Sequence, residues 1–317
     1  MTGGYSEGMD LLADVLAVSG VRGTLGARIE ATATWGVWWT DNPGAAFYAV
    51  TSGTAWLGVP GHDPRQLMPG DVVLLPTGVG HTLTSYPGAP APLCDSSTAA
   101  HARRTGGVLR FGDGDVQTHI LGAAYRHDPA VSTQVLELLP EVVHIRADNG
   151  GTCLDDTVRL LARELAHPQI AASVVMNSLV DILLVQLLRV WLATRPAPSE
   201  PSWLGVLGDP LMTEALTLVH ADPAAPWTTT ALAARLNVSK ATLARRFQSV
   251  AGETPAAYLT RWRMDLAAVR LRDGDEPLEA VAAAVGYSSV YAFSRAFSRA
   301  RGAAPGRFRA AARAVAA

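Results

Sequence analysis

The sequence predicts an α+β protein of more than one domain, with a β-rich N-terminal part and an all-helical C-terminal part. Three observations predict it. Short apolar segments separated by Gly and Pro turns fill residues 24–122, longer helical patterns follow Asp128-Pro129, and a segment near the C-terminus repeats itself after 50 residues. The chain has 317 residues, of which 49% are hydrophobic and 17% are charged. This composition excludes a disordered chain and is sufficient for separate apolar cores.

Two strands are predicted on either side of Gly53, at Phe47–Thr51 and Thr54–Val59, and a third at Val72–Leu75. The third segment is continuously apolar, which is typical of a strand buried on both faces. Strands at a spacing of about ten residues predict an all-β sandwich or barrel, and we place this domain at residues 1–130. Residues 87–107 are rich in Pro, Ala, Ser and Gly and are expected to form a loop.

Helices are predicted over 131–139, from a cap at Asp155-Asp156 to about Ala166, and over 170–194. The last of these is apolar almost all round, so we expect its own domain and a second copy of the chain to cover it, giving a homodimer. Its apolar run is nevertheless interrupted by polar residues, which argues against a membrane span. These residues are Asn177, Asp181, Gln186 and Arg189.

Residues 195–201 are rich in Pro and predict a semi-rigid linker. We therefore place a helical dimerisation region, which includes this linker, at residues 131–205, and a separate domain at residues 206–317. The N-terminus has no basic segment before its first apolar run, so we expect no signal peptide and a cytoplasmic protein.

The formal net charge of −2 hides an uneven distribution. Residues 206–317 hold 14 Lys and Arg against 9 Asp and Glu, whereas residues 1–205 hold 12 against 19. The C-terminal domain is therefore basic and the rest is acidic, which indicates a nucleic-acid partner for the C-terminal domain alone.

The C-terminal domain contains a duplicated unit. Shifting the sequence by 50 residues aligns Ala233 with Ala283, Ala234 with Ala284, Ser239 with Ser289, Arg245 with Arg295, Phe247 with Phe297, Gly252 with Gly302 and Pro255 with Pro305. Each copy predicts a short helix, a turn whose last Ser can cap the next helix, and a second helix ended by Gly. The predicted helices cover 231–236 and 240–250 in one copy, and 277–285 and 290–301 in the other. This order of elements defines two helix-turn-helix units.

The second helix of each copy has an apolar side and an outward side. Leu243, Phe247 and Val250 share one side in the first copy, and Phe293 and Phe297 do so in the second. An Arg stands on each outward side at the corresponding position, Arg245 and Arg295, where its guanidinium can bond to guanine in the major groove. Further arginines flank these faces and are candidates for phosphate contacts. They are Arg246, Arg299, Arg301, Arg307 and Arg309.

Three segments, Ser239–Phe247, Gly252–Leu259 and Val285–Arg309, resemble the DNA-binding domain of AraC/XylS-family transcriptional regulators. The resemblance implies two helix-turn-helix units joined by a linker helix at 255–272, with promoter DNA and RNA polymerase as partners and activation as the outcome. The residues expected to face DNA are Lys240, Ala241, Ala244, Arg245, Gln248, Val290, Tyr291, Ser294, Arg295 and Arg299. Alanine cannot donate a hydrogen bond to a base, so the first unit depends on Arg245, thymine methyl contacts and phosphates.

The segment Gly70–His81 fits the spacing G-x5-P-x-G-x2-H, the second motif of cupin barrels, and the N-terminal domain resembles the cupin-type sensor of AraC-type regulators. This resemblance places His81 inside the barrel. A cupin metal site normally adds two His and a Glu from an earlier strand, but no His or Glu lies between Glu30 and His62. Three or four ligands are needed, and His62 and His101 are the remaining partners, so we expect no metal and no other cofactor.

Several aromatic residues lie on the predicted strands, at Trp35, Trp38, Trp39, Tyr48 and Trp56. They pack in the core in one interpretation and line an effector pocket in the other. For the second interpretation we take Trp38, Tyr48 and His81 as the effector-binding residues. Cys94 lies in a predicted loop and is the candidate redox residue, with Cys153 as its possible partner.

Together these patterns predict a non-enzymatic, sequence-specific DNA-binding transcriptional regulator, controlled by a small molecule or a chemical stress sensed in the N-terminal domain. The alternative is a metal-dependent cupin enzyme with a nucleic-acid-binding tail, which bound metal lost on His81→Ala would support. A third hypothesis is a redox switch, which an oxidant response unchanged by Cys94→Ser would exclude.

Overall fold

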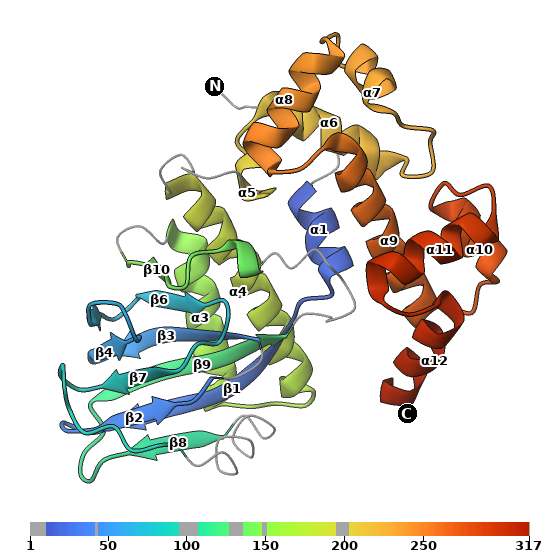
Figure 1. The fold of residues 1–317 in the computed structure, drawn as a ribbon. Helices are drawn as coiled ribbons and strands as arrows, with labels where there is room; N and C mark the ends of the chain where they lie inside the picture. Colours follow the sequence, from blue (N-terminus) through green and yellow to red (C-terminus); the bar gives the residue numbers. More distant parts are fainter. Residues whose placement is uncertain are drawn as a thin grey trace. The chain divides into compact units, whose positions relative to one another are not determined.

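The computed structural model describes residues 11–41, 44–94, 107–126, 136–147, 151–194 and 203–316. The chain forms two compact units (Figure 1). The β unit consists of Val21–His127 and Leu139–Pro196, and the helical unit consists of Met1–Gly20, Asp128–Leu138 and Ala197–Ala317. The sequence placed the N-terminal segment with the strands, whereas the structure groups it with the C-terminal helices.

The β unit contains two sheets. Their strands are β1 (Arg22–Ala31), β2 (Gly36–Trp39), β3 (Ala45–Ser52), β4 (Ala55–Gly58), β5 (Arg65–Leu67), β6 (Val72–Leu75), β7 (His81–Thr84), β8 (Val108–Phe111), β9 (Thr118–Arg126) and β10 (Val143–Ile145). One sheet has the order β10-β6-β3-β9-β1-β8 and the other β2-β7-β4-β5. The two predicted strands around Gly53 therefore belong to different sheets, and Gly53 makes the crossing with a left-handed backbone (φ 70°) that favours glycine.

The apolar core of the β unit lies between the two sheets. Inward-facing residues of β1, β3 and β6, such as Ile29, Val50 and Val73, pack there against Val37 and Leu57 of the second sheet. All four residues of β6 are buried, as its continuous apolar sequence predicts. This arrangement of two packed sheets confirms the predicted β architecture.

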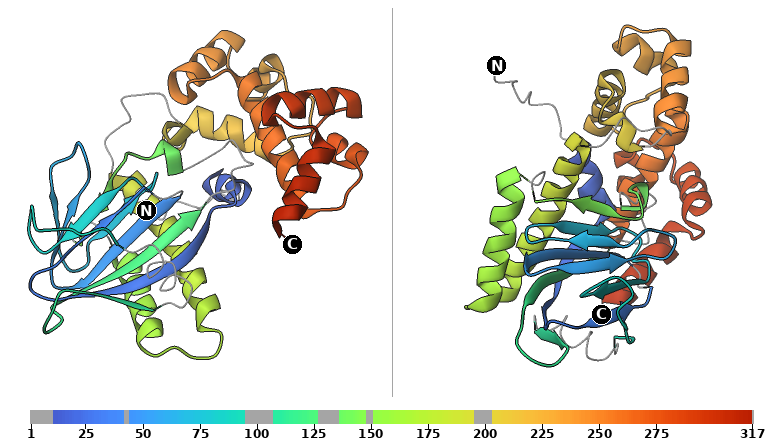
Figure 2. Two further views of the ribbon diagram at one scale, coloured as in Figure 1. Left: turned by 60° about the horizontal axis from the view of Figure 1, so that its bottom comes forward. Right: turned by 90° about the vertical axis from the view of Figure 1, so that its left-hand side faces the viewer.

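Two helices, α3 (Gly151–Ala166) and α4 (Ala172–Thr194), pack against each other and against the outer face of the six-stranded sheet (Figure 1). Figure 2 shows the resulting layers of helices, large sheet and small sheet. The sequence predicted a cap at Asp155-Asp156, but α3 begins four residues earlier, so these acidic residues lie inside the helix. Of the helix predicted over 131–139, residues 131–135 lie outside the described residues, and Leu136–Leu138 form a 3₁₀ turn.

The polar residues of α4 attach it to the edge of β1. The Gly23 backbone N–H donates to Asp181 Oδ1 at 2.6 Å, and the Leu25 N–H donates to Asn177 Oδ1 at 3.2 Å. The Tyr125 hydroxyl in turn donates to the Val180 carbonyl at 2.7 Å. By length and composition α4 is able to cross a membrane. Its contacts instead match those of a core helix of the β unit, because the polar side chains satisfy backbone groups that would otherwise be buried without partners.

The helical unit is formed by α1 (Leu11–Ser19), α5 (Trp203–Val206), α6 (Pro210–Ala221), α7 (Thr229–Arg235), α8 (Lys240–Ala251), α9 (Pro255–Asp273), α10 (Leu278–Ala284), α11 (Val290–Arg301) and α12 (Pro305–Ala316). The long helix α9 packs against α10, α11 and α12 (Figure 2). Phe293 and Phe297 are fully buried in that core, while Phe247 of α8 contacts Tyr258 at the start of α9. These helices confirm the predicted all-α C-terminal domain.

Helix α1 packs on α6 and α9, far from it in sequence. Asp14 of α1 accepts a hydrogen bond from His220 Nδ1 at 3.1 Å, and the Tyr258 hydroxyl bonds to His220 Nε2 at 2.7 Å. The imidazole also stacks on Trp262, with ring centroids 3.8 Å apart. Burial is the main reason that the pKa of His220 falls to about 4, so the ring is neutral at pH 7.

Candidate functional site

The first helix-turn-helix unit consists of α7 and α8. The Ser239 side chain accepts a hydrogen bond from the Thr242 backbone N–H at 3.0 Å and so caps α8. Gly252 ends the helix in a left-handed conformation (φ 74°). Leu243 and Phe247 lie on the inner side of α8 and are buried, as predicted, whereas Val250 is half-buried. The local sequence signals therefore define the limits of this helix correctly.

The second unit, α10 and α11, has the same construction but a longer turn. Ser289 caps α11 and Gly302 ends it (φ 70°), each exactly 50 residues after its counterpart. Helices α7 and α10, however, are offset by 49 residues. The buried alanine equivalent to Ala233 is Ala282, and Ala283 is exposed, so the predicted pairs Ala233/Ala283 and Ala234/Ala284 are wrong. The cause is one additional residue in the second turn, between Gly286 and Ser289.

The outward faces of α8 and α11 are open to solvent. Lys240, Ala241, Arg245, Gln248, Tyr291, Arg295 and Arg299 are exposed, and Ala244, Val290 and Ser294 are half-buried. Tyr291 is 72% exposed, an unusual position for a large aromatic side chain. The Arg295 guanidinium lies 5.7 Å from the centre of its ring, a cation–π contact that holds both side chains on the same face.

The flanking arginines divide into two groups. Arg246 pairs with Asp209, the residue that caps α6, and Arg301 pairs with the fully buried Asp265. Arg309 donates to the Glu276 carbonyl at 2.5 Å. Three of the five arginines predicted to touch phosphates thus make contacts inside the helical unit. Arg299 and Arg307 are exposed, and their contact with phosphates stays a prediction.

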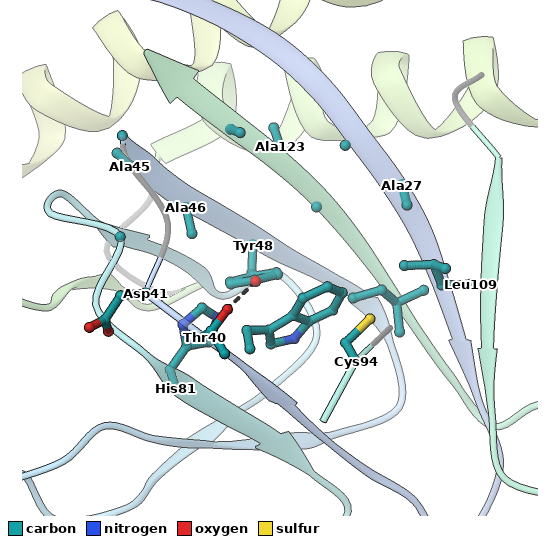
Figure 3. Close-up of a pocket in the computed structure, with 17 residues that line it drawn as sticks. Ala27, Thr40, Asp41, Ala45, Ala46, Tyr48, His81, Cys94, Leu109 and Ala123 are labelled. Atoms are coloured by element: carbon teal, nitrogen blue, oxygen red, sulfur yellow. Dashed lines mark hydrogen bonds between the residues drawn. The ribbon is translucent and has the colours of Figure 1, made fainter. Parts of the chain in front are cut away.

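A cavity of about 220 Å³ opens in the β unit (Figure 3). Its walls are mainly glycine and alanine from β1, β3 and β9, and its aromatic and polar side chains are Trp39, Tyr48, His81 and Cys94, with Thr40 and Asp41 also lining it. Small residues on neighbouring strands create the space, because larger side chains at these positions would fill the region between the sheets.

Tyr48 and His81 form a hydrogen-bonded pair in this cavity (Figure 3). The His81 Nδ1–H donates to the Val79 carbonyl at 2.8 Å, so Nε2 carries no proton and accepts from the Tyr48 hydroxyl, also at 2.8 Å. Burial lowers the pKa of His81 to about 4, although the bond to Val79 opposes the shift. The cavity therefore contains a neutral imidazole of fixed orientation.

The structure places two of the three predicted effector residues, Tyr48 and His81, in this cavity. Trp38 does not line it, and its neighbour Trp39 does. Val37 and Trp39 face the core, so Trp38 points to the opposite side of β2. Sequence reasoning missed Asp41, which lines the cavity, accepts a hydrogen bond from the Gly80 N–H and carries no motif of its own.

Cys94 is half-buried in the cavity wall, and its backbone N–H donates to the Trp38 carbonyl at 2.9 Å. Cys153 is exposed on α3, and neither cysteine forms a disulfide bond in the described part of the chain. His62 bonds to Glu141 at 2.8 Å, and His101 lies outside the described residues. Among the described residues, no three His, Cys, Asp or Glu side chains are grouped so as to hold a metal ion.

A two-sheet domain combined with two helix-turn-helix units indicates the class of the protein, a DNA-binding transcriptional regulator. Comparison with known proteins agrees. Residues 10–193 match the cupin family model, and residues 232–311 match the helix-turn-helix domain model. A putative AraC-like transcription regulator of Streptomyces lividans is 37% identical over 95% of this chain and 98% of its own length. A second, from Streptomyces antibioticus, is 37% identical over the same shares.

The chain belongs to the AraC-like transcription regulators. Among solved structures, the DNA-binding domain of AdpA in complex with a target DNA is 33% identical, covering 33% of this chain and 95% of that domain, with a TM-score of 0.32. The matches to the two family models and to the Streptomyces relatives confirm the resemblance found in the three C-terminal segments and in the Gly70–His81 motif.

Proposed function

We propose that this regulator binds promoter DNA through α8 and α11, with Arg245 and Arg295 as the principal base contacts. The observation that carries the proposal is their equivalence: the two arginines are 50 residues apart, both are exposed, and each lies on the outward face of a helix capped by Ser and ended by Gly. An exposed guanidinium in the major groove can bond to guanine O6 and N7.

The test is the affinity of the full chain for DNA from upstream of its own operon, measured by fluorescence anisotropy. Arg245→Ala and Arg295→Ala should each weaken specific binding by about 1–3 kcal/mol. Arg159→Ala is the matched control, because it removes the same charge from an exposed position on α3 in the β unit. Unchanged specific affinity in both recognition-helix variants would contradict the assignment.

We further propose that a second copy of the chain covers the exposed apolar residues of α3 and α4. Val174, Val175 and Ile182 on α4 are 65%, 42% and 45% exposed, and Leu160 on α3 is 41% exposed. Contiguous exposed apolar residues mark interaction surfaces, and two-fold dimers are the commonest oligomers. In sedimentation experiments, Ile182→Glu should shift the protein from dimer to monomer, whereas Gln66→Glu, exposed on β5 away from α3 and α4, should leave the dimer unchanged.

The cavity of the β unit is the proposed effector site, and contact with RNA polymerase, leading to activation in the cytoplasm, is the proposed outcome. The combination of a buried Tyr48–His81 pair with a wall built mainly of glycine and alanine supports the first part, because ligand pockets are mostly apolar with a few fixed polar groups. Transcription in vitro from the bound promoter, with and without the regulator, gives the sign: more transcript supports activation and less contradicts it.

A second candidate signal is oxidation of Cys94, which the position of this residue in the cavity wall favours. A peroxide would convert the thiol to a sulfenic acid with release of water or alcohol. Cys94→Ser should then abolish any change in DNA affinity caused by peroxide, while Cys153→Ser should not. An oxidant response that survives Cys94→Ser would contradict this candidate.

A further inference from the structure

The cavity of the β unit is shaped by the absence of side chains on three neighbouring strands. Ala27 pairs with Gly122 across β1 and β9, and Ala46 pairs with Ala124 across β3 and β9. All four residues line the cavity. Its volume of about 220 Å³ equals the liquid volume of roughly seven water molecules, and it lies below the usual range for drug-sized ligands. The occupant is therefore small, and most of its surface meets methyl groups and backbone.

The charges of the cavity are equally restrictive. Of the lining residues that the structure describes, none is Lys or Arg, and Asp41 is the acidic one, exposed to solvent. His81 is 3% exposed, and its pKa of about 4 keeps it neutral at pH 7. An anionic group entering the cavity would lose its hydration without meeting a cation among the described lining residues, which is unfavourable.

The third restriction is an unsatisfied donor. The Trp39 indole Nε1–H is buried and has no hydrogen-bond partner among the described residues. Trp39 lines the cavity and its ring also packs edge-on against Phe111. A buried N–H without a partner costs about 1–3 kcal/mol, so an occupant whose acceptor oxygen draws this N–H toward the cavity gains affinity.

We propose that the effector cavity takes a small, uncharged, largely apolar molecule that carries a hydroxyl or carbonyl oxygen, and that it rejects carboxylates and phosphates. This inference rests on the proposed effector role of the cavity and adds the chemical class of the ligand. On binding, the Trp39 indole turns its N–H to the oxygen of the ligand and donates to it, and the glycine and alanine walls of β1, β3 and β9 enclose the apolar part of the ligand.

Three probes of matched size test the class: benzyl alcohol, benzoate and benzylamine, each titrated into the full chain and followed by calorimetry. Benzyl alcohol should bind at least about tenfold more tightly than benzoate, because only benzoate must bury an uncompensated charge. It should also bind more tightly than benzylamine. Trp39→Phe should weaken benzyl alcohol binding by about three- to tenfold, the value of one hydrogen bond.

Ala46→Leu should abolish binding, because the added isobutyl group occupies the cavity. Ala166→Leu, at the exposed end of α3, is the matched control and should leave binding unchanged. Circular dichroism of each variant establishes that it is folded. Equal or tighter binding of benzoate, lost in Ala46→Leu, would overturn the class and keep the effector site.

Tightest binding of benzylamine, abolished by Asp41→Asn, would also overturn the class, in favour of a cation. Binding that survives Ala46→Leu, or no binding of any probe, would instead overturn the effector role of the cavity. DNA binding by α8 and α11 is measured separately and would stand in every case.

Discussion

The buried ion pair between Arg301 and Asp265 sets the stability of the helical unit, and its disruption should be costly. Asp265 is fully buried and the Arg301 side chain is 7% exposed. Asp265→Asn leaves a buried guanidinium without its anionic partner, a change that costs about 3–5 kcal/mol. The matched control is Asp275→Asn: Asp275 is 90% exposed, its partner Arg313 is 55% exposed, and exposed pairs contribute at most about 1 kcal/mol.

The assay is urea unfolding of the full chain, followed by tryptophan fluorescence, to which the buried Trp262 of the same unit contributes. The double variant Asp265→Leu/Arg301→Met should recover most of the loss, because apolar residues of similar volume often replace a buried ion pair without cost. A loss in Asp265→Asn no larger than that in Asp275→Asn would refute the reasoning.

A comparison of Arg301 with Arg299 on the same helix distinguishes a contribution to stability from a contribution to DNA binding. Because the Arg301 guanidinium is committed to Asp265, removing it should lower stability without changing the salt dependence of DNA affinity. Arg299 is exposed on the same helix, and Arg299→Ala should reduce the salt slope by about one without affecting stability. A reduced slope in Arg301→Met together with unchanged stability would contradict this assignment.

Three further perturbations have defined outcomes. Gly286→Ala should destabilise the helical unit by more than Gly302→Ala. Both glycines have left-handed backbones, but a Cβ at Gly286 would lie 2.8 Å from the Ala224 carbonyl oxygen, whereas one at Gly302 would meet nothing within 4 Å. Urea titrations of the two variants measure the difference in stability. The pKa of His81 is about 4 in the folded state, lower than the 6.5 of an unfolded chain, so the neutral ring contributes its full share of folding stability above pH 6.5 and about 3 kcal/mol of that stability is lost as the pH falls to 4. The free energy of unfolding should therefore differ less between pH 7.5 and pH 4.5 in His81→Gln than in the wild type. An equal difference in the two proteins would contradict the assignment. Asp181→Ala should destabilise the β unit by about 1–3 kcal/mol, because the Gly23 N–H loses its acceptor, and hydrogen exchange at Gly23 should accelerate relative to Ala31.

The helix-turn-helix units were predictable because local residues determine them. Ser239 and Gly252 act on groups within three or four positions of themselves, and their counterparts Ser289 and Gly302 do the same. The one-residue difference between the two turns escaped prediction because small residues surround it. Alanine occupies four of the positions from 280 to 284, so a shift of either 49 or 50 aligns alanine with alanine.

The cavity of the β unit was only partly predictable. The motif spacing placed His81 inside the fold, but its bond to Tyr48 joins residues 33 positions apart and depends on how β3 and β7 face each other. Trp38 and Trp39 were indistinguishable because Gly36–Trp39 has no polar residue to mark the outer face of the strand. Contacts such as Asp14 with His220, 206 positions apart, have no local signal at all.

The ion pairs of the helical unit determine which of its positive charges remain available to DNA. At least six of the nine acidic residues in 206–317 neutralise an arginine of the same unit. Cations that remain exposed include Lys240, Arg245, Arg295 and Arg299, all on α8 and α11. Arg235 of α7 and Arg307 of α12 are exposed as well, so the remaining exposed positive charge lies on α7, α8, α11 and α12. Each phosphate contact contributes about −0.9 to the salt slope, so this small number of exposed cations should give a shallow slope. Specificity is then expected from the proposed base contacts of Arg245 and Arg295.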